Sequence, residues 1–185
     1  MMGNDLGEVN WPKCGEMDIV EMGHATGIKN GTQDRYFNGA CHWGEKFNKG
    51  RYPNYGMNNT ADSSLQNDFH LFTLIWTPDS VRMYLDLDKY PNTKPYYSIG
   101  ISGDGSDNST SKYFHKPFFI LFNLAVGGYF TGLPAPSKCT VIVPENDNFK
   151  KITGLPADGT PAKMWIDYVR IYQKGDKGEE FSVAK

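Results

Sequence analysis

The sequence lacks a long apolar run and a cluster of basic residues. Its longest apolar stretch lies around residues 118–126, which is far too short to cross a bilayer. The formal net charge is -2, and the lysines and arginines form no stripe. Nucleic acid and membranes are therefore not expected as partners.

Cysteine and histidine are scarce and show no metal-binding spacing. The three cysteines, Cys14, Cys41 and Cys139, form no CxxC pair, and an odd number cannot close into a full set of disulfides. The four histidines are scattered, without the i, i+4 pairing of a helical metal site. No metal or other cofactor is therefore predicted for catalysis, and the redox compartment stays open.

Helical patterns of convincing length are also absent, whereas turns and alternating strands are frequent. The chain has 20 glycines, 11 prolines and 14% aromatic residues. Apolar residues alternate over 81–88, and the turn 77–80 links this strand to another over 69–76. Residues 118–126 predict a central strand, and 164–173 a second alternating one. Three polar stretches, 48–67, 98–111 and 134–161, predict long loops. The pattern indicates an all-β sandwich of antiparallel sheets.

One strand carries three acids among apolar residues. Glu16 and Asp18 share a face of a regular strand, but Glu21 lies five residues from Glu16 and would point the other way. A β-bulge near Ile19 and Val20 would restore the phase and turn all three carboxylates to one face. Such crowding costs stability and is typical of working sites. A solvent-facing acidic strand and a calcium-binding cluster are the alternatives.

Several motifs in chain order resemble glycoside hydrolase family 16. The acidic segment WPKCGEMDIVEMG resembles the ExDxxE signature in the bulged form of laminarinases and related β-glucanases. Four later segments are similar to family strands, namely GACHW (39–43), DFHLFTLIWTPDSVRMYLD (68–86), PFFILFNLAVGG (117–128) and MWIDYVRIYQ (164–173). The resemblance implies a jelly roll, a concanavalin-like β-sandwich of two curved antiparallel sheets with a substrate cleft.

The resemblance also implies roles at the acidic strand. Glu16 would be the nucleophile, Glu21 the general acid/base, and Asp18 would lie between them and tune their charge. The implied activity is retaining endo-hydrolysis of β-1,3- or mixed β-1,3/1,4-glucan by double displacement. Hydrolysis of a marine galactan such as agarose or carrageenan, and glucan binding without catalysis, are alternatives. Transglycosylation is a further possibility.

Five further residues are assigned by the same resemblance. Trp11, His42, Trp43 and Asn123 are expected to bind sugar, although Trp11 and His42 could instead be structural and Asn123 could satisfy backbone groups. Asp167 is expected to contribute to a structural calcium site away from catalysis.

The start of the chain departs from the family pattern. Met1-Met2-Gly3-Asn4 reads like mid-domain sequence and lacks the charged and apolar regions that are typical of a signal peptide. We expect a catalytic domain over residues 1–175 that lacks its N-terminal strands, followed by a tail at 176–185. The missing strands would leave apolar sheet surface exposed. A monomer that is secreted, periplasmic or attached to the cell surface and acts on β-glucan is expected from the resemblance.

Overall fold

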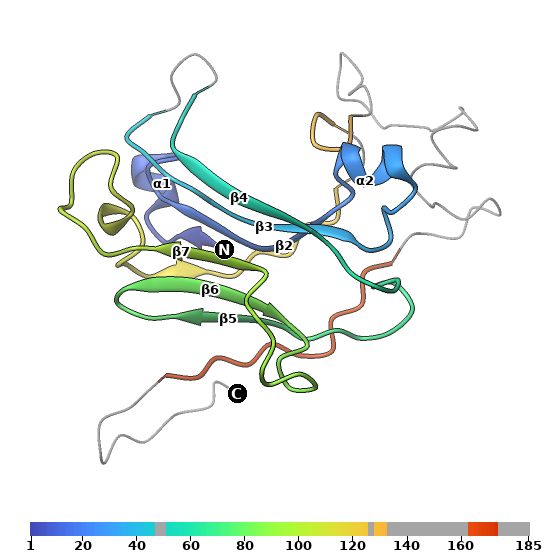
Figure 1. Ribbon diagram of the computed structural model, residues 1–185. Helices are drawn as coiled ribbons and strands as arrows, with labels where there is room; N and C mark the ends of the chain where they lie inside the picture. The colour runs from blue at the N-terminus through green and yellow to red at the C-terminus, as the bar shows by residue number, and fades with distance from the viewer. Residues whose placement is uncertain (47–50, 126–127, 133–162, 174–185) are drawn as a thin grey trace.

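The strands of the described residues form two antiparallel sheets, as the alternating sequence predicts. The computed structural model describes residues 1–46, 51–125, 128–132 and 163–173. Figure 1 shows the two sheets lying one over the other. The larger sheet has the strand order β4-β3-β2-β1-β8, and the smaller has the order β5-β6-β7.

The strands of the larger sheet are β1 (Met2–Gly3), β2 (Glu16–Met22), β3 (Tyr36–His42), β4 (Asn54–Thr60) and β8 (Phe118–Phe119). Those of the smaller sheet are β5 (Phe72–Trp76), β6 (Ser80–Leu85) and β7 (Tyr97–Gly100). The described residues also form three short helical turns, α1 (Leu6–Val9), α2 (Ala25–Asn30) and the 3-10 turn η1 (Thr110–Lys112). None of these helices is long and apolar enough to span a bilayer.

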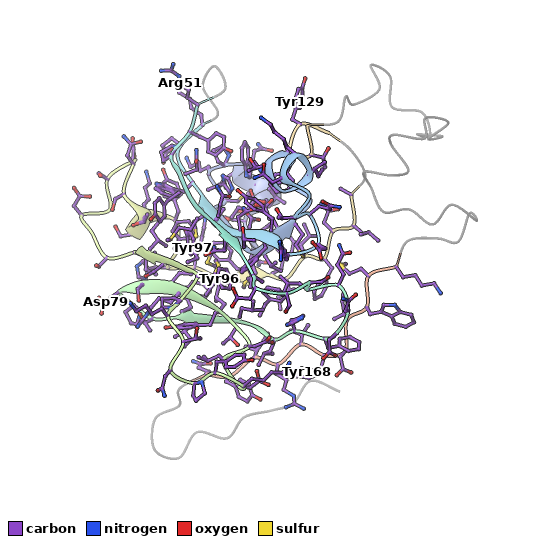
Figure 2. All side chains as sticks on the ribbon, turned by 45° about the vertical axis from the view of Figure 1, so that its right-hand side comes forward. Arg51, Asp79, Tyr96, Tyr97, Tyr129 and Tyr168 are labelled. Atoms are coloured by element: carbon purple, nitrogen blue, oxygen red, sulfur yellow. The ribbon has the colours of Figure 1, made fainter. Side chains whose placement is uncertain are left out.

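The core fills the space between the sheets. Met17 and Cys41 of the larger sheet and Val81 and Met83 of the smaller one are fully buried. Figure 2 shows Tyr96 and Tyr97 inside the molecule, between the layers. Burial of these large side chains is the main favourable term that holds the sheets together. Cys14 and Cys41 are buried free thiols.

The predicted hairpin is confirmed. Strands β5 and β6 pair in register from Phe72 with Leu85 to Trp76 with Val81. At the turn, the Thr77 N–H donates to the Ser80 carbonyl at 2.9 Å, and the Thr77 hydroxyl accepts from the Ser80 N–H at 3.1 Å. The first strand starts at Phe72 rather than at residue 69.

The prediction that residues 48–67 form a loop is wrong, because β4 lies within this stretch. Its residues are mostly polar and exposed, with three asparagines, so their strand propensity is low. The whole of β4 nevertheless pairs with β3, from Asn54 opposite His42 to Thr60 opposite Tyr36. Pairing with a strand distant in sequence outweighs the local preference. Residues 98–111 likewise contain the end of β7 and the turn η1.

Two predicted strands are largely absent from the described residues. Strand β8 ends at Phe119, and residues 120–125 are exposed and lie outside both sheets. Register explains this end, since β1 pairs Gly3 with Phe118 and Met2 with Phe119, and the next position on β1 is residue 1. Residues 163–173 are also outside both sheets, with Trp165 73% and Ile171 82% exposed (Figure 1). The exposure of apolar sheet surface through missing N-terminal strands stays a prediction.

Some predictions fall on residues outside the described part of the chain. These are the loop at 134–161, the tail at 176–185, the end of the central strand at Val126, and Cys139. The domain boundary at residue 175 stays a prediction.

Candidate active site

A β-bulge in β2 sets the direction of the acidic side chains. Pairing with β3 places Glu16 opposite His42 and Asp18 opposite Ala40, then skips one residue and places Glu21 opposite Asn38. The residues 38, 40 and 42 alternate on a regular strand and share one face. Side chains directly opposite in an antiparallel pair also share a face. All three carboxylates therefore lie on one side of the sheet, and the predicted bulge is confirmed.

The other face of the same strands packs into the core. Met17 lies opposite Cys41, and Met22 lies opposite Phe37. Met17, Cys41 and Phe37 belong to the buried cluster between the sheets. At the bulge, the hydroxyl of Tyr96 donates a hydrogen bond to the carbonyl oxygen of Ile19. A bulge interrupts the ladder of hydrogen bonds between β2 and β3. The hydroxyl of Tyr96, the residue before β7, satisfies one of the backbone groups at the bulge.

Glu16 is held by the indole of Trp11. The Trp11 Nε1–H donates to Glu16 Oε2 at 2.7 Å. Burial and the negative charge of Asp18 raise the pKa of Glu16, while the Trp11 hydrogen bond and His42 act to lower it. The Trp11 ring meets Tyr52 edge to face, with 4.6 Å between ring centroids. Trp11 and Tyr52 thus form an aromatic wall beside Glu16.

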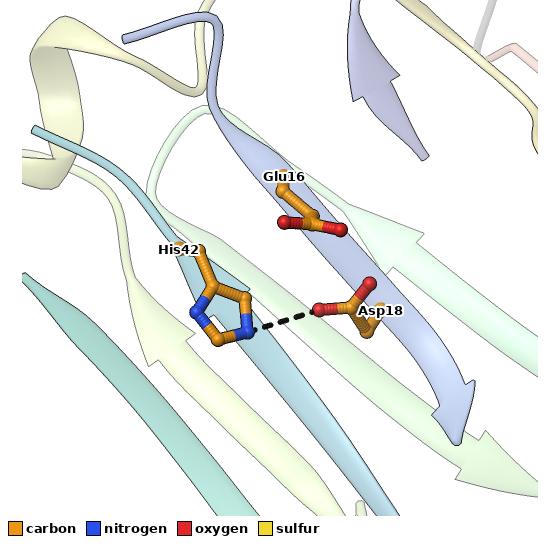
Figure 3. Close-up of side chains that lie close together, drawn as sticks. All are labelled: Glu16, Asp18 and His42. Carbon is orange, nitrogen blue, oxygen red and sulfur yellow. Dashed lines mark ion pairs between the residues drawn. The ribbon is translucent and has the colours of Figure 1, made fainter. Parts of the chain in front are cut away.

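Asp18 is paired with His42. The distance from His42 Nε2 to Asp18 Oδ2 is 3.1 Å, and both side chains are mostly buried (Figure 3). Burial acts to lower the pKa of His42, but the hydrogen bond to Asp18 and the charges of the three carboxylates outweigh it and raise the pKa. The His42 ring also lies 5.5 Å from the Tyr52 ring. The raised pKa favours the positively charged form of His42 beside the three carboxylates.

Ligand atoms of Glu16, Asp18 and His42 lie within 4.8 Å of one another. In the described part of the chain this is the one such group of three that could approach a cation. The ion pair between Asp18 and His42 accounts for the close approach without a metal.

Glu21 is held by Asn38 of β3. The Asn38 Nδ2–H donates to Glu21 Oε2 at 2.7 Å. Burial and the charge of Asp18 raise the pKa of Glu21, while Asn38 and His42 act to lower it. Glu16 and Glu21 thus have different hydrogen-bond donors, an indole and an amide, and share the charge of Asp18. A nearby like charge that raises a carboxyl pKa is what acid/base chemistry requires.

The chain is similar to several known proteins. Glucan endo-1,3-beta-glucosidase of Cryptopygus antarcticus is 36% identical over 123 residues, covering 66% of this chain and 41% of the relative. A solved family 16 glycoside hydrolase of Bacteroides ovatus for mixed-linkage glucan, in complex with a G4G4G3G product, is 33% identical with a TM-score of 0.59. That match covers 71% of this chain and 49% of the solved one. The chain belongs to glycoside hydrolase family 16.

The matches cover only part of each relative. No model of a protein family matches the chain. A beta-1,3-glucan-binding protein of Penaeus monodon is 30% identical over 132 residues, which cover 64% of this chain and 34% of the relative. The chain thus spans less than half the length of each of these three proteins.

Trp43, a predicted sugar-binding residue, lies in the core. Trp43, one residue beyond β3, is 8% exposed and packs in the core against Phe114, with 5.8 Å between ring centroids. Its Nε1–H donates to the Asn108 carbonyl at 3.0 Å. This position contradicts the predicted sugar contact of Trp43. Adjacent strand residues point to opposite faces, so His42 and Trp43 cannot both face the site.

Two predicted residues lie outside both sheets. Asn123 is exposed in the stretch 120–125, and Asp167 is exposed in 163–173. In the part of the chain that the structure describes, Asp167 belongs to no group of three potential metal ligands. Sugar binding by Asn123 and calcium binding by Asp167 stay predictions.

Asn38 and Tyr52 are the functional candidates that the sequence analysis missed. Asn38 could have been found by counting four residues back from His42 along β3, because this spacing keeps the same face. Tyr52 had no local signal, since its approach to Trp11 depends on the path of the chain between β3 and β4. Tyr52 also lines an open hollow of about 750 Å³ beside the site, together with Glu45 and Asp107. Family 16 chemistry on a long substrate would need such space.

Proposed function

We propose that the protein is a retaining endo-hydrolase of β-1,3- or mixed β-1,3/1,4-glucan that works by double displacement. The register shift between Asp18 and Glu21 carries the proposal, because it turns Glu16 and Glu21 to the same face of β2. Retaining glycosidases use two carboxyl groups roughly 5–5.5 Å apart on either side of the scissile bond. The substrates of the Cryptopygus antarcticus and Bacteroides ovatus relatives favour a β-glucan.

In the first step, the ionised Glu16 attacks the anomeric carbon, and the bond from that carbon to the glycosidic oxygen breaks. Glu21 gives its proton to the departing oxygen, so the leaving sugar departs as an alcohol. The hydrogen bond from Trp11 favours the ionised form of Glu16. The negative charge of Asp18 favours the protonated form of Glu21.

In the second step, the ionised Glu21 takes a proton from water. The water oxygen attacks the anomeric carbon, and the ester bond to Glu16 breaks. Glu16 returns as a carboxylate and Glu21 regains its proton. Two inversions at one carbon leave the product in the β configuration.

The groups around the acids suit a sugar ring. The aromatic wall of Trp11 and Tyr52 offers apolar faces to the C–H surface of a pyranose, and His42 offers a polar edge beside Asp18. A polymer substrate of this kind is degraded outside the cell, so we propose that the protein acts there.

The test is hydrolysis of laminarin, barley glucan and agarose, followed as reducing sugar. Release from the two glucans and none from agarose is expected. Glu21→Gln should lower kcat by about 10²–10⁴-fold, and Glu16→Gln should lower it at least as far. Glu8→Gln, a change of the same shape at an exposed glutamate of α1, should have no effect.

Azide separates the two roles. With Glu21→Ala, azide should attack the glycosyl-enzyme and give a β-glycosyl azide, and with Glu16→Ala it should attack the substrate directly and give the α-anomer. The opposite pairing of anomers with variants would reverse the two assignments. If folded Glu16→Gln hydrolysed glucan as fast as the parent protein, the proposed mechanism would be wrong.

A second candidate is glucan recognition without catalysis, which the match to the Penaeus monodon glucan-binding protein favours. The two candidates differ in turnover. If the parent protein binds laminarin but cleaves none of the three polymers, and Glu16→Gln binds equally well, the binding function replaces the enzyme.

A further inference from the structure

Asn38 is a buried polar residue in the middle of β3. It is 7% exposed, lies opposite Glu21 after the bulge, and donates from Nδ2 to Glu21 Oε2 at 2.7 Å. Its Oδ1 is buried and has no hydrogen-bond partner among the described residues. An unpaired buried acceptor lowers stability, so a purely structural amide would be expected to use both ends.

The chemistry proposed for Glu21 alternates between two protonation states. As general acid the carboxyl carries a proton and needs an acceptor, and as general base it is ionised and needs a donor. A side-chain amide offers both, since Nδ2 carries two donors and Oδ1 is an acceptor. A half-turn of the amide about its last bond exchanges the two, because the oxygen and the nitrogen occupy nearly equivalent positions.

Other charged and titratable groups near Glu21 cannot take this part. Asp18 and Glu16 on β2 are acids, and Asp18 is already bound to His42 of β3. Tyr52 lies in the segment between β3 and β4. Burial and the charges of all three carboxylates raise the pKa of its hydroxyl, and its ring packs on Trp11. Within the described residues, the amide of Asn38 is the one hydrogen-bond donor to the Glu21 side chain.

We propose that Asn38 is a positioning residue that holds Glu21 in both protonation states, donating from Nδ2 to the carboxylate and accepting at Oδ1 from the protonated acid. The proposal rests on the acid/base role proposed for Glu21. Ala40, the next residue of β3 on the same face, has a small side chain beside the amide.

The test uses Asn38→Leu, which keeps the size of the side chain and removes both functions. Asn58→Leu is the matched control, because Asn58 lies opposite Asn38 on β4 and shares its face. With a glucan, kcat/KM of Asn38→Leu should fall about tenfold or more, since a hydrogen bond to a charged group is lost. The alkaline limb should move to higher pH, because the amide lowers the pKa of Glu21.

An aryl β-glucoside with a dinitrophenyl leaving group separates the two steps. Its departure needs no acid, so kcat/KM should change little in Asn38→Leu, while kcat, limited by water attack, should fall. A fall in only one of the two steps, glucan cleavage or water attack, would overturn the two-state role. An equal shift of the alkaline limb in Asn58→Leu would also overturn it.

Carbon-13 NMR titration of the Glu21 carboxyl gives a readout that does not depend on turnover. Its midpoint should rise in Asn38→Leu and stay at the parent value in Asn58→Leu. If the protein cleaves no substrate, the proposed function fails while this titration still decides whether Asn38 acts on Glu21. Asn38→Asp serves if the leucine variant does not fold, and it should raise the midpoint through its negative charge. A midpoint unchanged in the folded variant overturns the proposal.

Discussion

The hydroxyl of Tyr96 donates a hydrogen bond to the backbone carbonyl of Ile19, at the point where β2 bulges. Tyr96 lies on the side of the smaller sheet, and its ring packs edge to face on Phe37 at 5.1 Å. Burial raises the pKa of Tyr96 above the usual range, so the phenol stays a donor at all working pH values. The geometry of the acidic face therefore depends on a contact from the opposite layer.

Tyr96→Phe should lower both stability and activity. Loss of one buried hydrogen bond costs about 1 kcal/mol, or roughly 2–4 °C in Tm for a chain of this size. Tyr97→Phe is the control, because the Tyr97 hydroxyl donates to the Tyr55 carbonyl on β4, away from the bulge. Thermal melts should show similar losses for the two variants, whereas only Tyr96→Phe should lower kcat. Equal kcat losses would mean that the contact at the bulge has no special effect on the acids.

Trp11→Phe should move the acidic limb of the pH–rate profile to higher pH. The indole N–H lowers the pKa of Glu16, so its removal raises that pKa, and Glu16 then ionises only at higher pH. The loss at the optimum should be about tenfold or more, as for a hydrogen bond to a charged group. Trp76→Phe, at an exposed tryptophan of β5, controls for the loss of an indole elsewhere. An acidic limb that stays in place would show that the N–H does not act on Glu16.

Asp18→Asn should move both limbs to lower pH. After burial, the charge of Asp18 is the largest cause that raises the pKa of Glu16 and of Glu21. Without it, Glu16 ionises at lower pH and Glu21 also loses its proton at lower pH. The pKa of His42 should fall as well, since Asp18 is its bonded partner. Profiles of kcat/KM between pH 3 and 9, with carbon-13 titration of both glutamates, test this, and an upward move of either limb would contradict it.

The sequence predicted the acidic face because two independent patterns broke at one place. The acids and the apolar residues both lost alternation near Ile19 and Val20, and a single extra residue restores both. Alternation along β3 could also have excluded Trp43 from the site, since Trp43 directly follows His42.

The parts that sequence reasoning missed depend on distant pairing. Strand β4 has an asparagine-rich sequence that favours loops, and only its ladder with β3 makes it a strand. Residues 118–125 carry the apolar pattern of a central strand, but register with β1 continues only to Met2. A pattern of side chains predicts what a segment can bury, whereas the partner that buries it lies elsewhere in the chain.

The skipped position in β2 has a consequence for how the face is encoded. Removing one residue at 19–20 would remove the need for the bulge, because Asp18 and the acid would then stand two positions apart on a regular strand and share a face. If the strand instead kept all its residues and lost the bulge, Glu21 would lie opposite Phe37, and its carboxyl group would enter the interior that Met22 now faces. The number of residues between Asp18 and Glu21, together with the bulge that absorbs the extra one, decides which side of the sheet receives the acid.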